Sequence, residues 1–159
     1  MHRIDPQPQT AQPAPEAPVN ALGVAEMFAV WAIRLWVLAY RGGGNLLPDL
    51  RRGFALAGAP AAWLDLDEFL TRLLGNVRRP LDIRPVASPL LSSDELGALH
   101  WLAGLQSEDP ATPHCDRLQT IAAPGARLAR SLAAAGLRFG STARDGGFAT
   151  QRAGDHLIQ

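Results

Sequence analysis

The sequence predicts an all-α protein, with five to six helices packed around a long apolar first helix. Three observations carry this prediction: apolar residues recur at helical spacing, capping residues precede these segments, and glycine or proline follows them. The length of 159 residues, 47% of them hydrophobic, suits one domain or two small helical lobes with a sizeable core.

Composition excludes several classes of function. The single cysteine, Cys115, excludes an internal disulfide framework and a cysteine-rich zinc or iron–sulfur centre. The formal net charge of zero argues against a sequence-blind nucleic-acid binder, which needs excess cationic side chains. We expect no cofactor and no metal, because the four histidines lack the paired spacing of metal ligands. Abundant alanine, and arginine without lysine, indicate the coding bias of a GC-rich bacterial genome.

Residues 1–19 are expected to form a disordered tail, because they hold five prolines and no apolar periodicity. They do not read as a secretory signal, so a cytoplasmic protein is expected. A long helix is then predicted over 21–40, with Asn20 as its N-cap and the glycines 42–44 as its stop. Its length invites a membrane-spanning interpretation. Glu26 and Arg34, however, roughly cancel the transfer free energy of its apolar residues, which argues against a span.

The predicted first helix is apolar over most of its circumference. Glu26, Arg34 and Arg41 share a narrow polar stripe, and large apolar side chains occupy the remaining arc. Such a helix lies in the centre of a bundle or is shared between a core and a partner. The candidate partner-binding residues on this flank are Phe28, Trp31, Leu35 and Trp36.

Two shorter helices complete an expected N-terminal lobe, residues 20–77. One follows Pro48 and stops at Gly58; the other runs over 60–76 with the apolar spacing of an amphipathic helix. Asp65 and Glu68 resemble a capping box at the start of the second helix, which explains these carboxylates without any acid–base chemistry. Residues 78–91 contain three prolines and are predicted to form an extended linker between two lobes.

The expected C-terminal lobe, residues 92–140, begins with a clear signal. Ser92 and Glu95 form the S-x-x-E pattern of a capping box ahead of an apolar run. His100 lies on the apolar face of this helix, where a lone histidine is more often a core residue than a ligand. A further helix begins at Thr112-Pro113 and is expected to end at Pro124-Gly125, followed by a last helix that ends at Gly136. Residues 141–159 are expected to be a flexible tail or part of a small β-hairpin.

The order of these C-terminal elements resembles a winged helix-turn-helix domain. That resemblance makes the last helix a recognition helix, and it implies DNA contacts by Arg127, Arg130, Ser131 and Arg144. Arginines and acidic residues are nearly balanced in this half, whereas DNA-binding modules usually carry a local cationic excess. The sequence therefore does not favour nucleic acid as the partner.

The only reactive-looking cluster is His114-Cys115-Asp116. Neighbouring residues on a helix diverge by about 100°, so His114 and Cys115 do not face each other as a base and a nucleophile must. The expected function is therefore that of a non-catalytic interaction or regulatory protein, which docks a protein partner or a second copy of itself through the apolar flank. The alternatives are a DNA-binding regulator, and a thiol-based redox sensor or small enzyme at Cys115.

Overall fold

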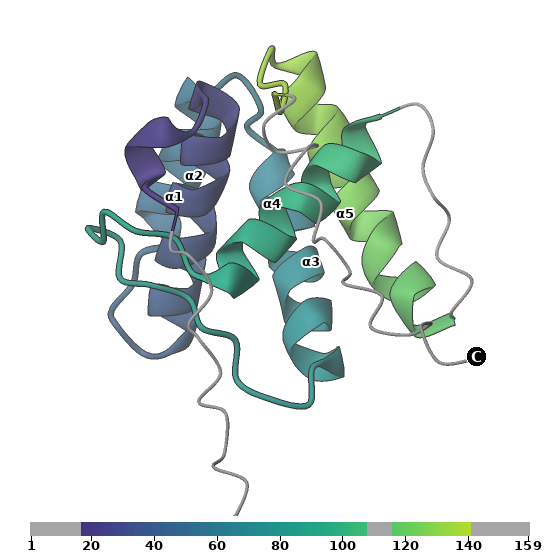
Figure 1. The fold of residues 1–159 in the computed structure, drawn as a ribbon. Coiled ribbons are helices and arrows are strands. Elements are labelled where there is room, and N and C mark those ends of the chain that lie inside the picture. The colour runs from purple at the N-terminus through teal and green to yellow at the C-terminus, as the bar shows by residue number, and fades with distance from the viewer. Residues whose placement is uncertain (1–16, 108–115, 141–159) are drawn as a thin grey trace, which may run out of the picture.

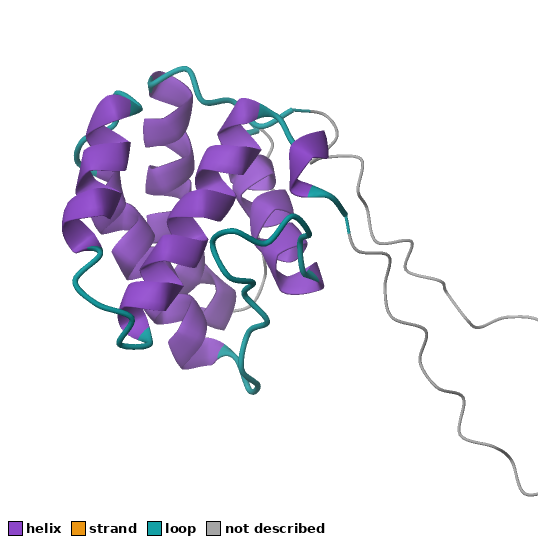
Figure 2. Ribbon diagram, turned by 90° about the vertical axis from the view of Figure 1, so that its left-hand side faces the viewer, coloured by secondary structure: helices purple, strands orange, loops and turns teal. Residues whose placement is uncertain are grey.

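Helices account for nearly all regular structure in the part of the chain that the computed structural model describes, residues 17–107 and 116–140 (Figures 1 and 2). The elements are a short 3-10 helix, η1, and five α-helices; no strand occurs among the described residues. The all-α prediction is thus confirmed for this part of the chain. The bounds are η1 Val19–Ala21, α1 Val24–Tyr40, α2 Leu47–Leu56, α3 Ala62–Asn76, α4 Ser93–Gln106 and α5 Asp116–Ala134.

The helices are not arranged as a ring around the first one. α1 contacts α2, α3 and α4, whereas α5 packs against α3 and α4 (Figure 1). One hydrophobic core joins residues from both expected lobes, including Ile33 of α1, Phe69 of α3 and Leu128 of α5. α3 from the first half of the chain packs directly on α5 from the second, so this core includes residues of both expected lobes.

α1 starts three residues later than expected. Gly23 is its N-cap in place of Asn20, and no side chain caps it, because the chain first forms η1. The glycine stop is as predicted: Gly42 and Gly44 have φ angles of 84° and 108°, which favour a residue without a Cβ. No helix among the described residues is long and apolar enough to cross a membrane.

α2 and α3 occupy the predicted segments, but the predicted cap of α3 is wrong. This helix begins at Ala62, its N-cap is Ala61, and no side chain accepts a bond from its first amides. Asp65 is already within the first turn. Both Asp65 and Glu68 instead bind Arg127 of α5.

The segment between α3 and α4 is extended, as its prolines predict, but it is built into the fold. Ile83 and Leu91 are buried in the core. Leu91 donates a backbone hydrogen bond to Ala17 (2.8 Å), and Val19 donates one to Pro89 (2.8 Å). The last residues of the expected N-terminal tail are thus ordered against this segment.

α5 runs through Pro124 and Gly125, so the predicted break there is wrong. Proline cannot donate to the carbonyl four residues earlier, and Arg72 of α3 supplies a donor to that carbonyl of Thr120 at 3.1 Å. A Cβ on Gly125 would lie 2.9 Å from Leu105 and 3.2 Å from Phe69. At the predicted stop, α5 therefore packs closely against α3 and α4.

Several expectations lie outside the described residues. They concern the tail over residues 1–16, His114 and Cys115, and the tail or hairpin over 141–159 with Arg144.

Candidate interaction surface

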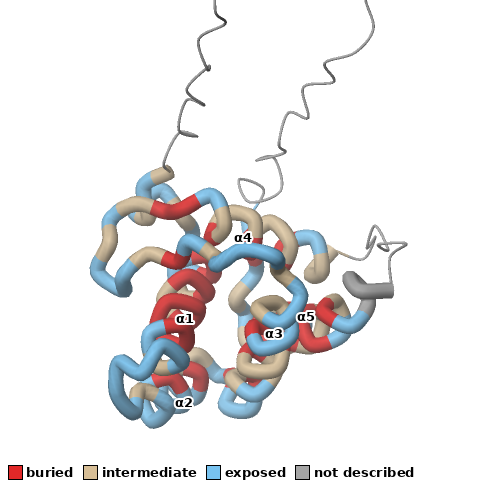
Figure 3. The backbone as a smooth tube through the Cα atoms, turned by 90° about the horizontal axis from the view of Figure 1, so that it is seen from below, coloured by how far each residue is buried: buried red, intermediate tan, exposed pale blue. Residues whose placement is uncertain are grey.

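α1 buries its two charged side chains together with most of its apolar ones, and it leaves a few apolar side chains exposed. Glu26 and Arg34 are each only 3% exposed, although they make up most of the predicted polar stripe. By contrast, Val24 is 70% exposed, Met27 38% and Leu38 43%. Figure 3 shows that most of α1 is buried, so the uncovered part is a narrow strip.

The exposed apolar residues lie on one side of the helix, but the strip is interrupted, because residues 32–37 between Trp31 and Leu38 are all buried. At about 100° per residue, Val24, Met27, Trp31 and Leu38 fall within about 60° of one another. We call these four residues the α1 seam. No charged residue belongs to the seam, so it offers a partner only apolar contact.

The structure separates the four predicted docking residues into two pairs. Leu35 and Trp36 lie in the core, 8% and 4% exposed, and are not accessible to a partner in this fold. Trp36 donates its indole N–H to Asp67 Oδ1 (2.8 Å) and stacks on Tyr40. Asp67 therefore has a structural role in the described chain.

The other predicted pair, Phe28 and Trp31, is half-buried against α2. Their ring centroids are 5.6 Å apart, and Phe28 meets Phe54 of α2 edge-on at 5.1 Å. The Trp31 ring lies directly over Gly53, where an added Cβ would collide with the ring. α2 thus holds Trp31 in place at the edge of the α1 seam.

Sequence reasoning missed Val24, Met27 and Leu38. Their position beside Trp31 on the helical wheel was the available signal. An almost wholly apolar helix, however, does not reveal which sector its neighbours leave uncovered.

The inward position of Arg34 is explained by a buried network. Its guanidinium binds the carboxylate of Glu95 on α4 through two hydrogen bonds of 2.7 and 3.0 Å. It also donates to the backbone carbonyls of Ser88 and Leu90 (2.8 Å each) and, more weakly, to that of Val86 (3.4 Å). One arginine therefore fastens α1 both to α4 and to the extended segment before it.

The Glu95 carboxylate also accepts hydrogen bonds from two backbone N–H groups. It accepts bonds from the backbone N–H of Arg84 (3.1 Å) and of Ser92 (2.9 Å), while Ser92 Oγ accepts from the Glu95 backbone N–H (3.1 Å). The capping box predicted from S-x-x-E is thereby confirmed. Its glutamate also forms the buried ion pair, which the spacing did not indicate.

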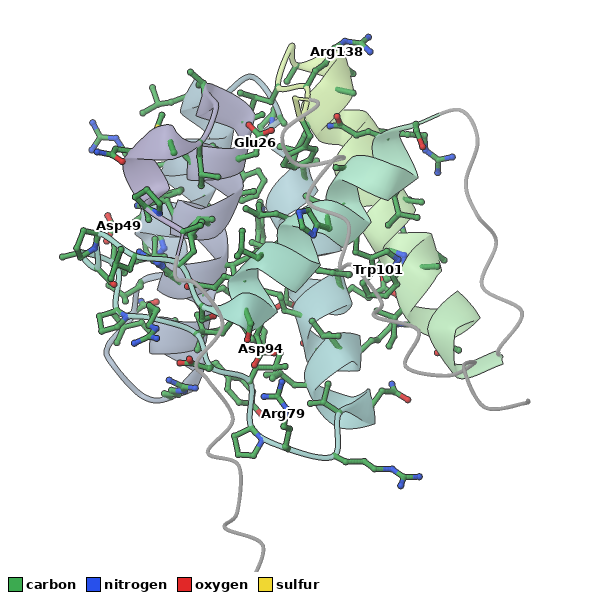
Figure 4. All side chains as sticks on the ribbon, viewed as in Figure 1. Glu26, Asp49, Arg79, Asp94, Trp101 and Arg138 are labelled. Atoms are coloured by element: carbon green, nitrogen blue, oxygen red, sulfur yellow. The ribbon has the colours of Figure 1, made fainter. Side chains whose placement is uncertain are left out.

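A second ion pair lies at the N-terminal end of α4. Asp94 accepts bonds from both terminal nitrogens of Arg79 (2.6 and 2.8 Å) and from the backbone N–H of Asp82 (2.7 Å). Figure 4 places Arg79 next to Asp94, below the first turn of α4. The bond from Arg79 holds the pKa of Asp94 below its usual value, and the same bond raises the pKa of Arg79.

The predicted DNA-contacting residues have different surroundings. Arg127 is bonded to Asp65 (2.8 Å) and to Glu68 of α3, and the bond to Asp65 raises its pKa. Arg130 is exposed, and Ser131 is half-buried. Arg127 thus already serves the packing of α5 on α3.

His100 is half-buried and lines a pocket of about 160 Å³ together with buried Glu26. Glu26 Oε1 accepts a bond from the backbone N–H of Gly140 (2.6 Å), which ties the chain after α5 to α1. Within residues 17–107 and 120–140, no three His, Cys, Asp or Glu side chains converge as metal ligands would. No protein-family model, no curated protein and no solved structure matches this chain.

Proposed function

We propose that this chain is a non-catalytic interaction protein, which docks an apolar helix of a partner protein or of a second copy onto the α1 seam. The observation that carries the proposal is that α1 buries both Glu26 and Arg34 and leaves the apolar Val24, Met27 and Leu38 exposed. A helix on the surface of a protein without partners normally has the opposite polarity.

The dimensions of the seam suit a helix. From Val24 to Leu38 the seam spans roughly 20 Å at about 1.5 Å per residue, with Val24, Met27 and Trp31 at one end and Leu38 beyond the buried residues 32–37. An amphipathic partner helix presents apolar anchors at the i, i+3, i+4 and i+7 spacing and covers such a strip. Because the seam lacks charge, a charged partner surface would lose its hydration there without compensation.

Trp31 has the properties of an anchoring residue. Its ring is held on Gly53 and beside Phe28, so little conformational freedom is lost when a partner covers its outer edge. Tryptophan held in this way is enriched among the residues that dominate binding free energies.

The test is a double substitution, Val24→Glu with Met27→Glu. Val24 is the first residue of α1, where the helix dipole favours an acidic side chain, so the fold should be retained. Sedimentation velocity on the pure protein detects a homodimer. Chemical cross-linking in native lysate, with identification of the captured proteins, detects a heterologous partner. We expect the double variant to abolish whichever complex the native chain forms.

The matched control is Leu56→Glu on α2. Leu56 is 80% exposed and lies outside the seam, so this variant should retain the complex. A native chain that stays monomeric at about 100 μM, and that captures the same proteins as the double variant, would remove the proposal.

A further inference from the structure

A pocket of about 260 Å³ lies on the opposite side of α1 from the seam, between α1, α3, α4 and the extended segment. Each helix contributes one face at the i, i+3, i+4 spacing. α1 contributes Ile33, Trp36 and Val37, and α3 contributes Leu70, Leu73 and Leu74. Leu81 and Ile83 of the extended segment cover another side. The walls are thus almost entirely apolar.

On α4, the wall of the pocket includes a glycine, which has no side chain to fill the space. Ser93, Gly97 and Trp101 follow at four-residue spacing on the face of α4 that lines the pocket. No atom lies within 4 Å of the place where a Cβ of Gly97 would be. A larger residue at position 97 would fill the space. Glycine is also unfavourable inside a helix, so its presence here is not explained by helix propensity. Gly97 therefore leaves room between Ser93 and Trp101.

Water is a poor occupant of this space. Water that fills this open pocket makes few hydrogen bonds to the aliphatic and aromatic walls, so an apolar molecule gains free energy by displacing it. The pocket is open to solvent on the side of the exposed Ser93, and its volume of about 260 Å³ exceeds the roughly 150 Å³ of a closed apolar cavity that takes up benzene.

The mouth of the pocket selects for an uncharged molecule. Its polar groups are the hydroxyl-bearing Ser93 and the carboxylate of Asp94. Asp94 is already neutralised by the two bonds from Arg79, so neither charge is available to a ligand. A charged group brought into the apolar interior would therefore lose its hydration without compensation.

We propose that this pocket is a binding site for a small uncharged molecule with an apolar body, carrying at most one hydroxyl group near Ser93. This inference is independent of the seam, because it rests on the opposite side of α1 and on α4.

The test uses 1-hexanol and indole as neutral probes, with hexanoate and hexylammonium as charged probes of the same chain length. Isothermal titration calorimetry gives the affinity. The fluorescence of Trp36 and Trp101, which line the pocket, reports the location of 1-hexanol in a Trp31→Phe/Trp63→Phe background, since the chain has four tryptophans. Indole fluoresces as tryptophan does, so its binding is followed by calorimetry alone. We expect dissociation constants near or below about 1 mM for at least one neutral probe, and binding at least tenfold weaker for both ions.

The decisive variant is Gly97→Leu, and its matched control is Gly104→Leu on the same helix. Both glycines have open space at the Cβ position, but Gly104 is exposed and does not line the pocket. Gly97→Leu should weaken binding of the neutral probe at least tenfold, while Gly104→Leu should leave it unchanged. Gly97→Ala adds only the Cβ and gives a smaller loss, so it carries the test if the leucine variant does not fold.

Three results would overturn the inference. One is that neither 1-hexanol nor indole binds at 10 mM. Another is that Gly97→Leu, shown by circular dichroism to be folded, binds as the native chain does. The third is that hexanoate or hexylammonium binds as tightly as 1-hexanol.

Discussion

Arg34 illustrates at the residue scale how a charge becomes tolerable inside a protein. Removal of a guanidinium and a carboxylate from water costs several kcal/mol per ion in effective terms. Two charge-assisted bonds to Glu95 and two short bonds to the carbonyls of Ser88 and Leu90 offset that cost. Each partner thus depends on the other, and the loss of one leaves a buried charge uncompensated.

We therefore expect Arg34→Met to lower the free energy of unfolding by about 3–5 kcal/mol, measured by urea titration at pH 7. The double variant Arg34→Met/Glu95→Gln should lose clearly less than the sum of the two single losses, since no unpaired charge remains.

Arg41→Met is the matched control, because Arg41 is an exposed arginine just after α1 with one long bond to the carbonyl of Leu81 (3.3 Å). It should change the unfolding free energy by less than about 0.5 kcal/mol. Equal losses for Arg34→Met and Arg41→Met would contradict the role assigned to the buried pair.

Asp94 makes the free energy of unfolding depend on pH in the acidic range. The bond from Arg79 lowers the pKa of Asp94 in the folded chain below its unfolded value. The resulting stabilisation is fully present above the unfolded pKa and is lost as the pH falls through the folded pKa. We expect the stability difference between the native chain and Asp94→Asn to be constant from pH 7 to about 5 and to shrink below about pH 4.

Urea titrations at pH 7, 5 and 3 measure this dependence. In the Arg79→Met background the same substitution should have a much smaller effect at pH 7, since the donor that lowers the pKa is gone. A difference that stays the same down to pH 3 in the native background would count against this explanation.

At the element scale, α1 and α5 are both held by side chains from other helices at points where local sequence signals misled. Arg34 and Glu26 point inward because α4 and the residues after α5 supply their partners. α5 continues through Pro124, and Arg72 donates to the carbonyl of Thr120, the one to which the backbone of residue 124 would donate in a regular helix. Local propensity is a weak guide wherever such tertiary partners exist.

Arg127 gives a test of how α5 is held on α3. Arg127→Met removes the bonds to Asp65 and Glu68 and should lower the urea midpoint of unfolding. The effect should diminish in 1 M NaCl, because salt screens partly exposed ion pairs. Arg130→Met, one turn further along the same helix and exposed, should leave the midpoint unchanged. Equal effects of both substitutions would show that Arg127 has no special part in this packing.

At the scale of the whole molecule, one core joins residues far apart in the sequence. α3 packs on α5, α1 packs on α4, and the extended segment between α3 and α4 contributes Ile83 and Leu91 to the same core. α1 therefore has two distinct sides. One side faces the interior and the pocket that Gly97 of α4 also lines, and the other side is the α1 seam.

The positions of α2, α3 and α4 and the capping box at Ser92 and Glu95 could be predicted from the sequence. These features depend on residues within a few positions of one another, so apolar spacing and capping patterns contain the necessary information. Half of the predicted docking flank, Phe28 and Trp31, lies at or beside the seam, whereas Leu35 and Trp36 lie in the core.

Only the tertiary structure decided which sector of α1 stays uncovered, where Arg34 points, and that Gly97 faces open space. Each of these facts depends on elements distant in the sequence, such as the 61 residues that separate Arg34 from Glu95. The physical reason is that burial and pairing are properties of packed neighbours. A helix that is apolar nearly all round does not specify on which side those neighbours lie.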